Sequence, residues 1–175
     1  TYVEDSTPPI APSPIVVTPT GPANNNSPQI SGLAETGSTV NIYATNNCSG
    51  AIVATGSAAT FTTGITVAVS NDSTTSFTAK AVDAALNNSV CSASVSYTED
   101  STPPTVISVT SSTTNGSFGV ASSVSIQVGF SEPVTVTGTP QLTLETGTTD
   151  AVVDYLSGSG TATLNFTYTV AAGQN

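Results

Sequence analysis

Apolar and polar side chains alternate over most of the chain, and the alternation is clearest in its second half. Residues 124–130 read VSIQVGF and residues 162–170 read ATLNFTYTV, so that every second side chain is apolar. A period of two residues is that of a β-strand with one buried face. The positions predicted to point inward are Val124, Ile126, Val128, Phe130, Ala162, Leu164, Phe166, Tyr168 and Val170.

Shorter runs of the same kind occupy residues 39–44, 64–69, 76–81 and 90–97. Val, Thr and Ser dominate these runs, and Gly, Asn, Pro and Asp separate them, as is typical of strands and turns. The predicted inward positions are Val40, Ile42, Ala44, Ile65, Val67, Val69, Phe77, Ala79, Ala81, Cys91, Ala93, Val95 and Tyr97, with the serines of the last run outside. No stretch shows a helical period of 3.6, so we predict an all-β chain of antiparallel β-sandwiches with almost no helix.

A proline-containing octapeptide occurs twice, as YVEDSTPP at residues 2–9 and as YTEDSTPP at residues 97–104. Two consecutive prolines fix φ and donate no backbone hydrogen bond, so a sheet cannot continue through them. The distance between the copies is that of an immunoglobulin-like domain of about 100 residues. We therefore predict two tandem modules, residues 8–100 and 105–175, joined at 101–104. Residues 1–7 would end a preceding repeat, and Tyr2 would close its last strand.

Charge and composition restrict the function. Only 7% of the residues are charged, and eleven acids against one base, Lys80, give a net charge of −10. Such a chain cannot neutralise the phosphates of a nucleic acid or of an anionic membrane. Histidine is absent, which removes the commonest general base, and no apolar run is long enough to span a membrane. We expect neither an enzyme nor an inserted membrane protein, and any export signal would lie outside this sequence.

The two cysteines, Cys48 and Cys91, allow two interpretations: a disulfide or a pair of buried free thiols. In an exported β-sandwich, an even pair favours the disulfide. In the chain-entropy model, closing the loop between them is worth roughly 4 kcal/mol. A core rich in Ala and Val would gain most from such a bridge.

Two segments resemble known repeats. SPQISGLAETGSTVNIYATNNCSGAIVATG at residues 27–56 and FTAKAVDAALNNSVCSASVSYTEDSTPP at residues 77–104 resemble the immunoglobulin-like repeats of very large bacterial surface adhesins and biofilm proteins. Their typical pattern is P-x-I-S-G-x-A-E-x-G-S-T-V, then A-x-D-A-A-G-N, then D-x-T-x-P. Residues 106–147 and 155–175 resemble a second tandem repeat type of giant bacterial surface proteins, whose members normally continue for a few dozen residues more.

The resemblance implies two tandem immunoglobulin-like sandwiches, the second incomplete at its C-terminus, in a structural spacer of a cell-surface adhesin or extracellular fibre. Its partners would be neighbouring repeats of the same chain or other copies of itself. In one alternative, the missing strands come from another chain and the protein is a self-assembling filament subunit. In another, it is a glycan- or protein-binding module, for which Tyr43 is the tyrosine that alternation places outside.

In resembling repeats, acids near the module boundaries coordinate Ca²⁺, which prefers clustered oxygen ligands. Leu86 stands where those repeats have glycine. The alternative is that the carboxylates only keep the surface soluble. The candidate calcium ligands are Asp83, Asn87, Glu99 and Asp100, with Glu4 and Asp5 at the upstream border.

Overall fold

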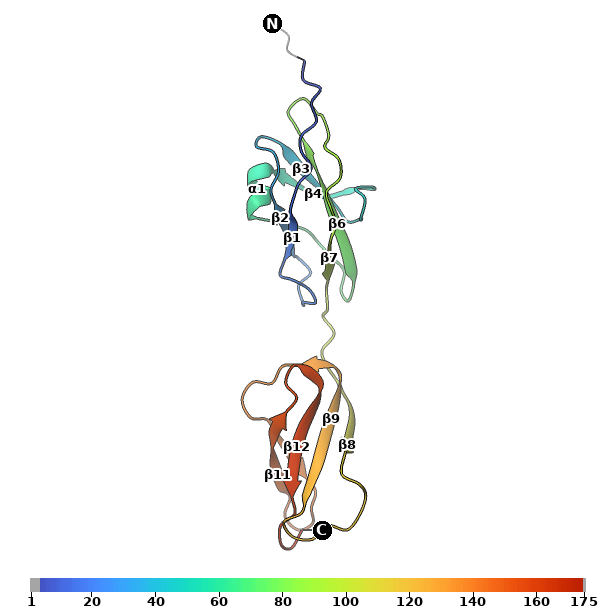
Figure 1. Ribbon diagram of the computed structural model, residues 1–175, viewed down its shortest axis with the longest axis vertical. Coiled ribbons are helices and arrows are strands. Elements are labelled where there is room, and N and C mark those ends of the chain that lie inside the picture. The colour runs from blue at the N-terminus through green and yellow to red at the C-terminus, as the bar shows by residue number, and fades with distance from the viewer. Residues whose placement is uncertain (1–3, 175) are drawn as a thin grey trace. The chain divides into compact units, whose positions relative to one another are not determined.

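The computed structural model describes residues 4–174, so Tyr2 lies outside the described residues. The chain divides into two compact units, and the division lies between Thr102 and Pro103 (Figure 1). Strands account for 44% of the residues and helix for 4%, so the fold is all-β. The strands of both units pair in antiparallel sheets, and each unit has its own cluster of buried hydrophobic side chains.

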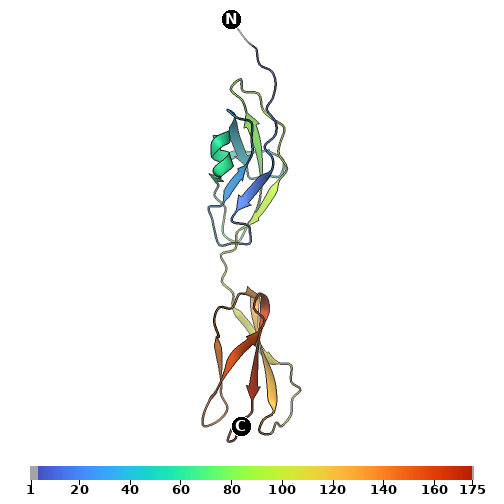
Figure 2. The same cartoon turned by 60° about the vertical axis from the view of Figure 1, so that its left-hand side comes forward.

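Two antiparallel sheets form unit 1 and enclose its core (Figure 2). The three-stranded sheet has the order β1 (Ile15–Thr18), β2 (Gln29–Gly32), β5 (Ile65–Thr66). The four-stranded sheet has the order β4 (Ile52–Ser57), β3 (Thr39–Tyr43), β6 (Thr74–Val82), β7 (Val95–Thr98). The longest strand of the unit, β6, pairs with both β3 and β7.

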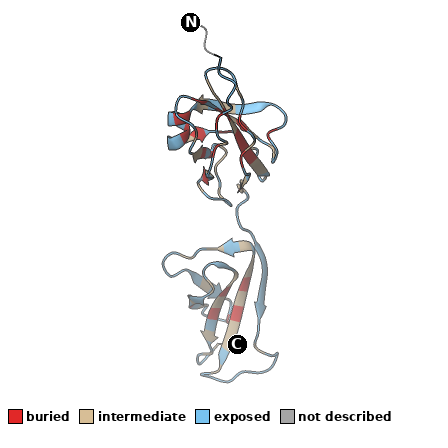
Figure 3. Ribbon diagram, turned by 45° about the horizontal axis from the view of Figure 1, so that its top comes forward, coloured by how far each residue is buried: buried red, intermediate tan, exposed pale blue. Residues whose placement is uncertain are grey.

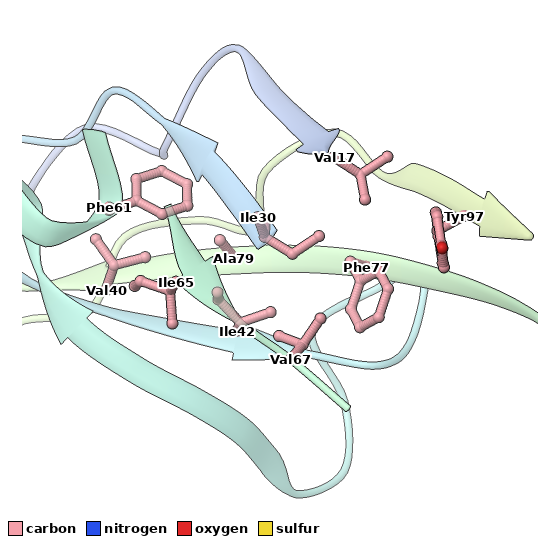
Figure 4. Packing of buried hydrophobic residues seen from close by; sticks show 10 residues of the cluster. All are labelled: Val17, Ile30, Val40, Ile42, Phe61, Ile65, Val67, Phe77, Ala79 and Tyr97. Atoms are coloured by element: carbon pink, nitrogen blue, oxygen red, sulfur yellow. The ribbon is translucent and has the colours of Figure 1, made fainter. Parts of the chain in front are cut away.

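The core of unit 1 contains side chains from both sheets (Figure 4). The alternation predicted in β3 and β6 is confirmed at Val40, Ile42, Phe77, Ala79 and Ala81, all of which have no exposed surface. It is wrong at Ala44, which is exposed because β3 ends one residue earlier.

One short helix, α1 (Ala58–Thr63), connects β4 to β5. The Ser57 hydroxyl caps it by accepting a hydrogen bond from the backbone N–H of Thr60 at 3.1 Å. Ala58 and Phe61, three residues apart, bury the inner side of the helix, and Phe61 has no exposed surface. The sequence does not indicate this helix, because six residues are too few to display a helical period.

The predicted last strand of unit 1 is shorter than its alternation suggests. β7 begins at Val95, and residues 88–93 run beside β6 outside any strand, with one isolated antiparallel bridge between Asn88 and Val82. Ser92, predicted outside, is buried, and Ala93, predicted inward, is exposed. The hydroxyls of Ser92 and of the buried Ser89 accept the backbone N–H groups of Ala79 and Ala81, both at 2.9 Å. In a regular sheet, the carbonyl groups of a neighbouring strand would accept these two N–H groups. Here the serine hydroxyls accept them, which buries the serine side chains.

The predicted disulfide between Cys48 and Cys91 is confirmed, with Cα atoms 5.8 Å apart. Cys48 lies buried in the loop between β3 and β4, where its N–H donates to the Thr78 hydroxyl of β6 at 3.1 Å. Cys91 belongs to the segment before β7 and is half-buried. The bridge therefore joins two irregular segments across β6.

Unit 2 contains one antiparallel sheet of five strands among its described residues (Figure 1). Their order is β10 (Gln141–Leu144), β11 (Ala151–Ser157), β12 (Thr161–Thr169), β9 (Ser123–Val134), β8 (Val106–Ser111). The inward positions predicted for β9 and β12 are confirmed at Ile126, Val128, Leu164 and Phe166, which are buried, whereas the other predicted positions are half-buried. Burial is less complete than in unit 1, because even Phe166 retains 5% exposure and every residue of β8 is exposed (Figure 3).

Replacing both cysteines, Cys48→Ser/Cys91→Ser, is expected to lower the free energy of unfolding of unit 1 by about 4 kcal/mol, because the unfolded chain regains the freedom of the closed loop. Hydrogen exchange in increasing denaturant, resolved by peptide, measures both units in one sample. Unit 2 contains no cysteine and serves as the internal control. An unchanged unit 1 transition would show that the bridge does not stabilise the fold.

Candidate functional site

The predicted calcium ligands of unit 1 lie at two ends of β6. Asp83 and Asn87 follow its last residue, whereas the N–H of Glu99 donates to the carbonyl of Ser73, just before its first residue, at 2.8 Å. β6 has nine residues, which corresponds to about 30 Å. Asp83 and Asn87 therefore cannot share one ion with Glu99 and Asp100, and we treat the upstream and downstream ends separately.

At the upstream end, the carboxylate of Asp83 closes its own loop. Its Oδ1 accepts the backbone N–H of Asn87 at 2.8 Å and its Oδ2 accepts the Asn87 side-chain amide at 2.9 Å. These hydrogen bonds lower the pKa of Asp83, and the bond from the Asn87 side chain has the largest effect. Both oxygens of this carboxylate therefore have a hydrogen-bond donor within the loop.

The same asparagine ties the loop to the incoming chain. Asn87 Nδ2 also donates to the main-chain oxygen of Asp5 at 3.0 Å, so residue 5 enters unit 1 beside this loop. The Asp5 carboxylate accepts the N–H of Thr7 at 3.0 Å, a local turn contact, and Glu4 is exposed. The upstream candidates thus come together around Asn87 through main-chain and amide contacts rather than through clustered carboxylates.

Leu86 forms the turn of this loop in the left-handed region, with φ at 70°, and its side chain is 77% exposed. The left-handed conformation favours glycine, the residue that the resembling repeats have at this position. The tight turn is therefore kept although the glycine is missing, since the hydrogen bonds between Asp83 and Asn87 hold it closed.

At the downstream end, Glu99 is buried to 1% exposure. Its Oε2 accepts the N–H of Asp72 at 2.7 Å and the hydroxyl of Ser101 at 3.3 Å. Its Oε1 is also buried and has no hydrogen-bond partner among the described residues. A buried carboxylate oxygen without a donor is costly, and it is the one chemical feature of this end that remains unsatisfied.

Asp72 lies against Glu99 but was not among the residues predicted from the sequence. Its Oδ1 accepts the backbone N–H of Ser101 at 2.9 Å, and this bond is the main reason why its pKa is lowered. The available signal was the pair Asn71 and Asp72 before a strand, because such residues tolerate the left-handed φ of 51° that Asp72 adopts. Asp100, half-buried beside them, accepts the N–H of Thr102 at 3.3 Å.

Tyr97 lies next to this cluster with only 1% of its surface exposed. Burial, and secondly the charge of Glu99, raises the pKa of its phenol, which therefore stays neutral and can donate. Its hydroxyl lies 3.1 Å from the carbonyl oxygen of Ala23 and 2.8 Å from that of Asn25.

The cluster by itself is not a complete metal site: within residues 4–174, no three His, Cys, Asp or Glu side chains gather as ligands for one ion. The same residues include no helix long and apolar enough to cross a membrane. Comparison with known proteins adds no relative, because no family model, no curated protein and no solved structure matches the chain. The residues at the two ends of β6 are therefore the remaining source of evidence for function.

Leu86→Gly is expected to stabilise unit 1 by up to about 1 kcal/mol, because relief of the left-handed strain, roughly 1–2 kcal/mol, exceeds the entropy that glycine loses on folding. Denaturant unfolding measures the change. Leu33→Gly is the matched control: Leu33 is also exposed, at 60%, but is not left-handed, so the same replacement should destabilise the unit. Equal effects at the two positions would contradict the strain argument.

Proposed function

We propose that the chain is a structural spacer of a repetitive extracellular protein, such as a bacterial surface adhesin or fibre. The observation that carries the proposal is the position of the chain ends in unit 1. Asp5 enters beside the loop that follows β6, and Glu99 leaves beside the residue that precedes β6. A unit whose chain enters at one end and leaves at the other adds its own length to the polypeptide, which is the task of a spacer.

The disulfide supports the extracellular part of the proposal. Structural disulfides form and persist in oxidising surroundings and are rare in the cytosol. Cys48 is buried and the bridge closes a sequence separation of 43 residues, so the bond belongs to the folded core rather than to an exposed redox site.

We further propose that the downstream end of unit 1 binds Ca²⁺. The buried Oε1 of Glu99 has no donor, and Lys80, the one base of the sequence, belongs to β6 rather than to this loop. A hard cation such as Ca²⁺, which prefers oxygen ligands, would bind this unpaired oxygen. Glu99, Asp72 and Asp100 would hold the ion, with further oxygens from water. The bound charge would fix the exit segment of the chain against the turn that precedes β6. Asp83 lies at the other end of β6 and is not part of this proposed site.

Glu99→Gln tests the cation proposal, because the amide keeps the size of the side chain and removes its charge. Calcium is expected to raise the melting temperature of the wild-type chain relative to chelator, and the variant should lose this rise. Glu35→Gln, which changes an exposed carboxylate of the same unit, should keep it. Identical wild-type melting curves in calcium and in chelator, together with no heat of calcium binding in calorimetry, would reject the proposal.

One observation favours a second candidate, a filament subunit completed by strands from other copies. Val106, Ile107 and Val109 of β8 are 57%, 67% and 60% exposed, although Val109 pairs with the buried Val128 and shares its face. An exposed apolar edge strand is a template for another strand.

Small-angle scattering over a range of protein concentrations separates the two candidates. A spacer keeps its units apart as a monomer, so its radius of gyration should clearly exceed about 16 Å, the value for one compact globule of this length, at every concentration. A particle mass that grows with concentration would favour strand exchange. A monomer with the compact value would contradict the spacer.

A further inference from the structure

The segment that follows β1 and the last segment of unit 1 are joined by a parallel contact near its downstream end. Ala23 forms a parallel bridge with Glu99. The N–H of Ala23 donates to the carbonyl of Thr98 at 3.2 Å, and its carbonyl accepts the N–H of Asp100 at 3.1 Å. Residues 21–25 follow β1, and residues 97–100 include the end of β7. We call the two segments together the terminal clamp.

Two further features make the terminal clamp tight. The buried Tyr97 hydroxyl can donate to the carbonyl of Ala23 or to that of Asn25, at 3.1 and 2.8 Å. Gly21 lies so close to β7 that a Cβ atom there would be 2.7 Å from the oxygen and 2.8 Å from the nitrogen of Thr98. Any larger residue at this position would push the two segments apart.

The direction of the clamp determines how it responds to tension. A pull on both ends of the chain first loads β1 against β2, with which it pairs at four positions. It then draws the segment before Ala23 towards the upstream end and β7 the opposite way, because Asp5 and Glu99 lie at opposite ends of β6. Parallel segments that are pulled apart along their length are sheared. All their hydrogen bonds are then loaded together, whereas bonds that unzip are loaded one after another.

The disulfide lies outside this path in the folded state. Both cysteines fall between the two halves of the clamp in the sequence and are separated by 43 residues. If the clamp ruptures, the chain before Cys48 and the chain after Cys91 are free to extend, while the residues between them stay closed by the covalent bond.

We propose that the terminal clamp is the element of unit 1 that resists stretching, and that the Cys48–Cys91 bridge limits how far the unit extends after the clamp ruptures. The inference rests on the proposed spacer function, since only a chain under tension uses either property. The two are tested separately: force measurements concern the clamp, and scattering concerns the spacer, so either can fail alone.

Magnetic tweezers test the inference on the full chain, held by tags at both ends at constant force. The unit 1 event is the one whose released length grows in Cys48→Ser/Cys91→Ser, by roughly 150 Å, because a loop of 43 residues at about 3.6 Å each becomes extensible. Tyr97→Phe should shorten the time before this event roughly tenfold at the same force, because forced unfolding follows the unfolding rate and the hydroxyl bonds are lost. The released length should not change.

Thr78→Val is the matched control, because it removes another buried hydroxyl, one that contacts Thr45 and Cys48 outside the clamp. Its dwell time under force should stay near that of the wild type, although both variants lower chemical stability. Gly21→Ala should act like Tyr97→Phe. Equal shortening by the Tyr97 and Thr78 variants, or none by Tyr97→Phe, overturns the clamp. An unchanged released length in the cysteine variant overturns the extension limit.

Discussion

The arrangement of unit 1 depends on the hydrogen bond that the buried phenol of Tyr97 donates to the main chain. A hydroxyl taken out of water requires a partner, and this one finds main-chain carbonyls of the segment that follows β1. The aromatic ring belongs to the main core cluster, so the same side chain completes the packing and closes the first segment of the unit on its last strand. The parallel bridge between Ala23 and Glu99 forms beside it, and the chain leaves the unit from there.

A second constraint follows from the charge balance. With eleven acids and one base in the sequence, most carboxylates have no base to pair with, and several accept hydrogen bonds from backbone or side-chain donors instead. Asp83 accepts from Asn87, and Asp72 accepts from Ser101. These contacts shape the loops at both ends of β6. Oε1 of Glu99, like Oε1 of Glu132 in unit 2, is buried without a hydrogen-bond donor among the described residues.

The two units differ in how completely they bury their apolar side chains. In unit 1, two sheets and a helix cover a core in which side chains such as Phe61 and Phe77 have no exposed surface, and a disulfide cross-links the unit. The described residues of unit 2 form one sheet, whose most buried side chain keeps 5% exposure. A sheet with an apolar face is stable only when something covers that face. This contrast is why strand exchange remains a second candidate for unit 2 and not for unit 1.

The sequence by itself determined the elements that depend on local pattern. Alternation predicted the inward faces of β3, β6, β9 and β12, because a two-residue period leaves only one way to bury apolar side chains. The even cysteine pair predicted the disulfide. The pattern was wrong where a side chain replaces a backbone contact, as at Ser92, and where six residues form a helix too short to display its period.

Only the tertiary structure decided which acids lie together. In the sequence, Asp83 and Asn87 stand closer to Glu99 than Asp72 does, yet β6 holds Asp83 and Glu99 at opposite ends and brings Asp72 against Glu99. Strand pairing, rather than distance along the chain, sets these neighbours. The pairing depends on the packing of two whole sheets, which no local pattern records.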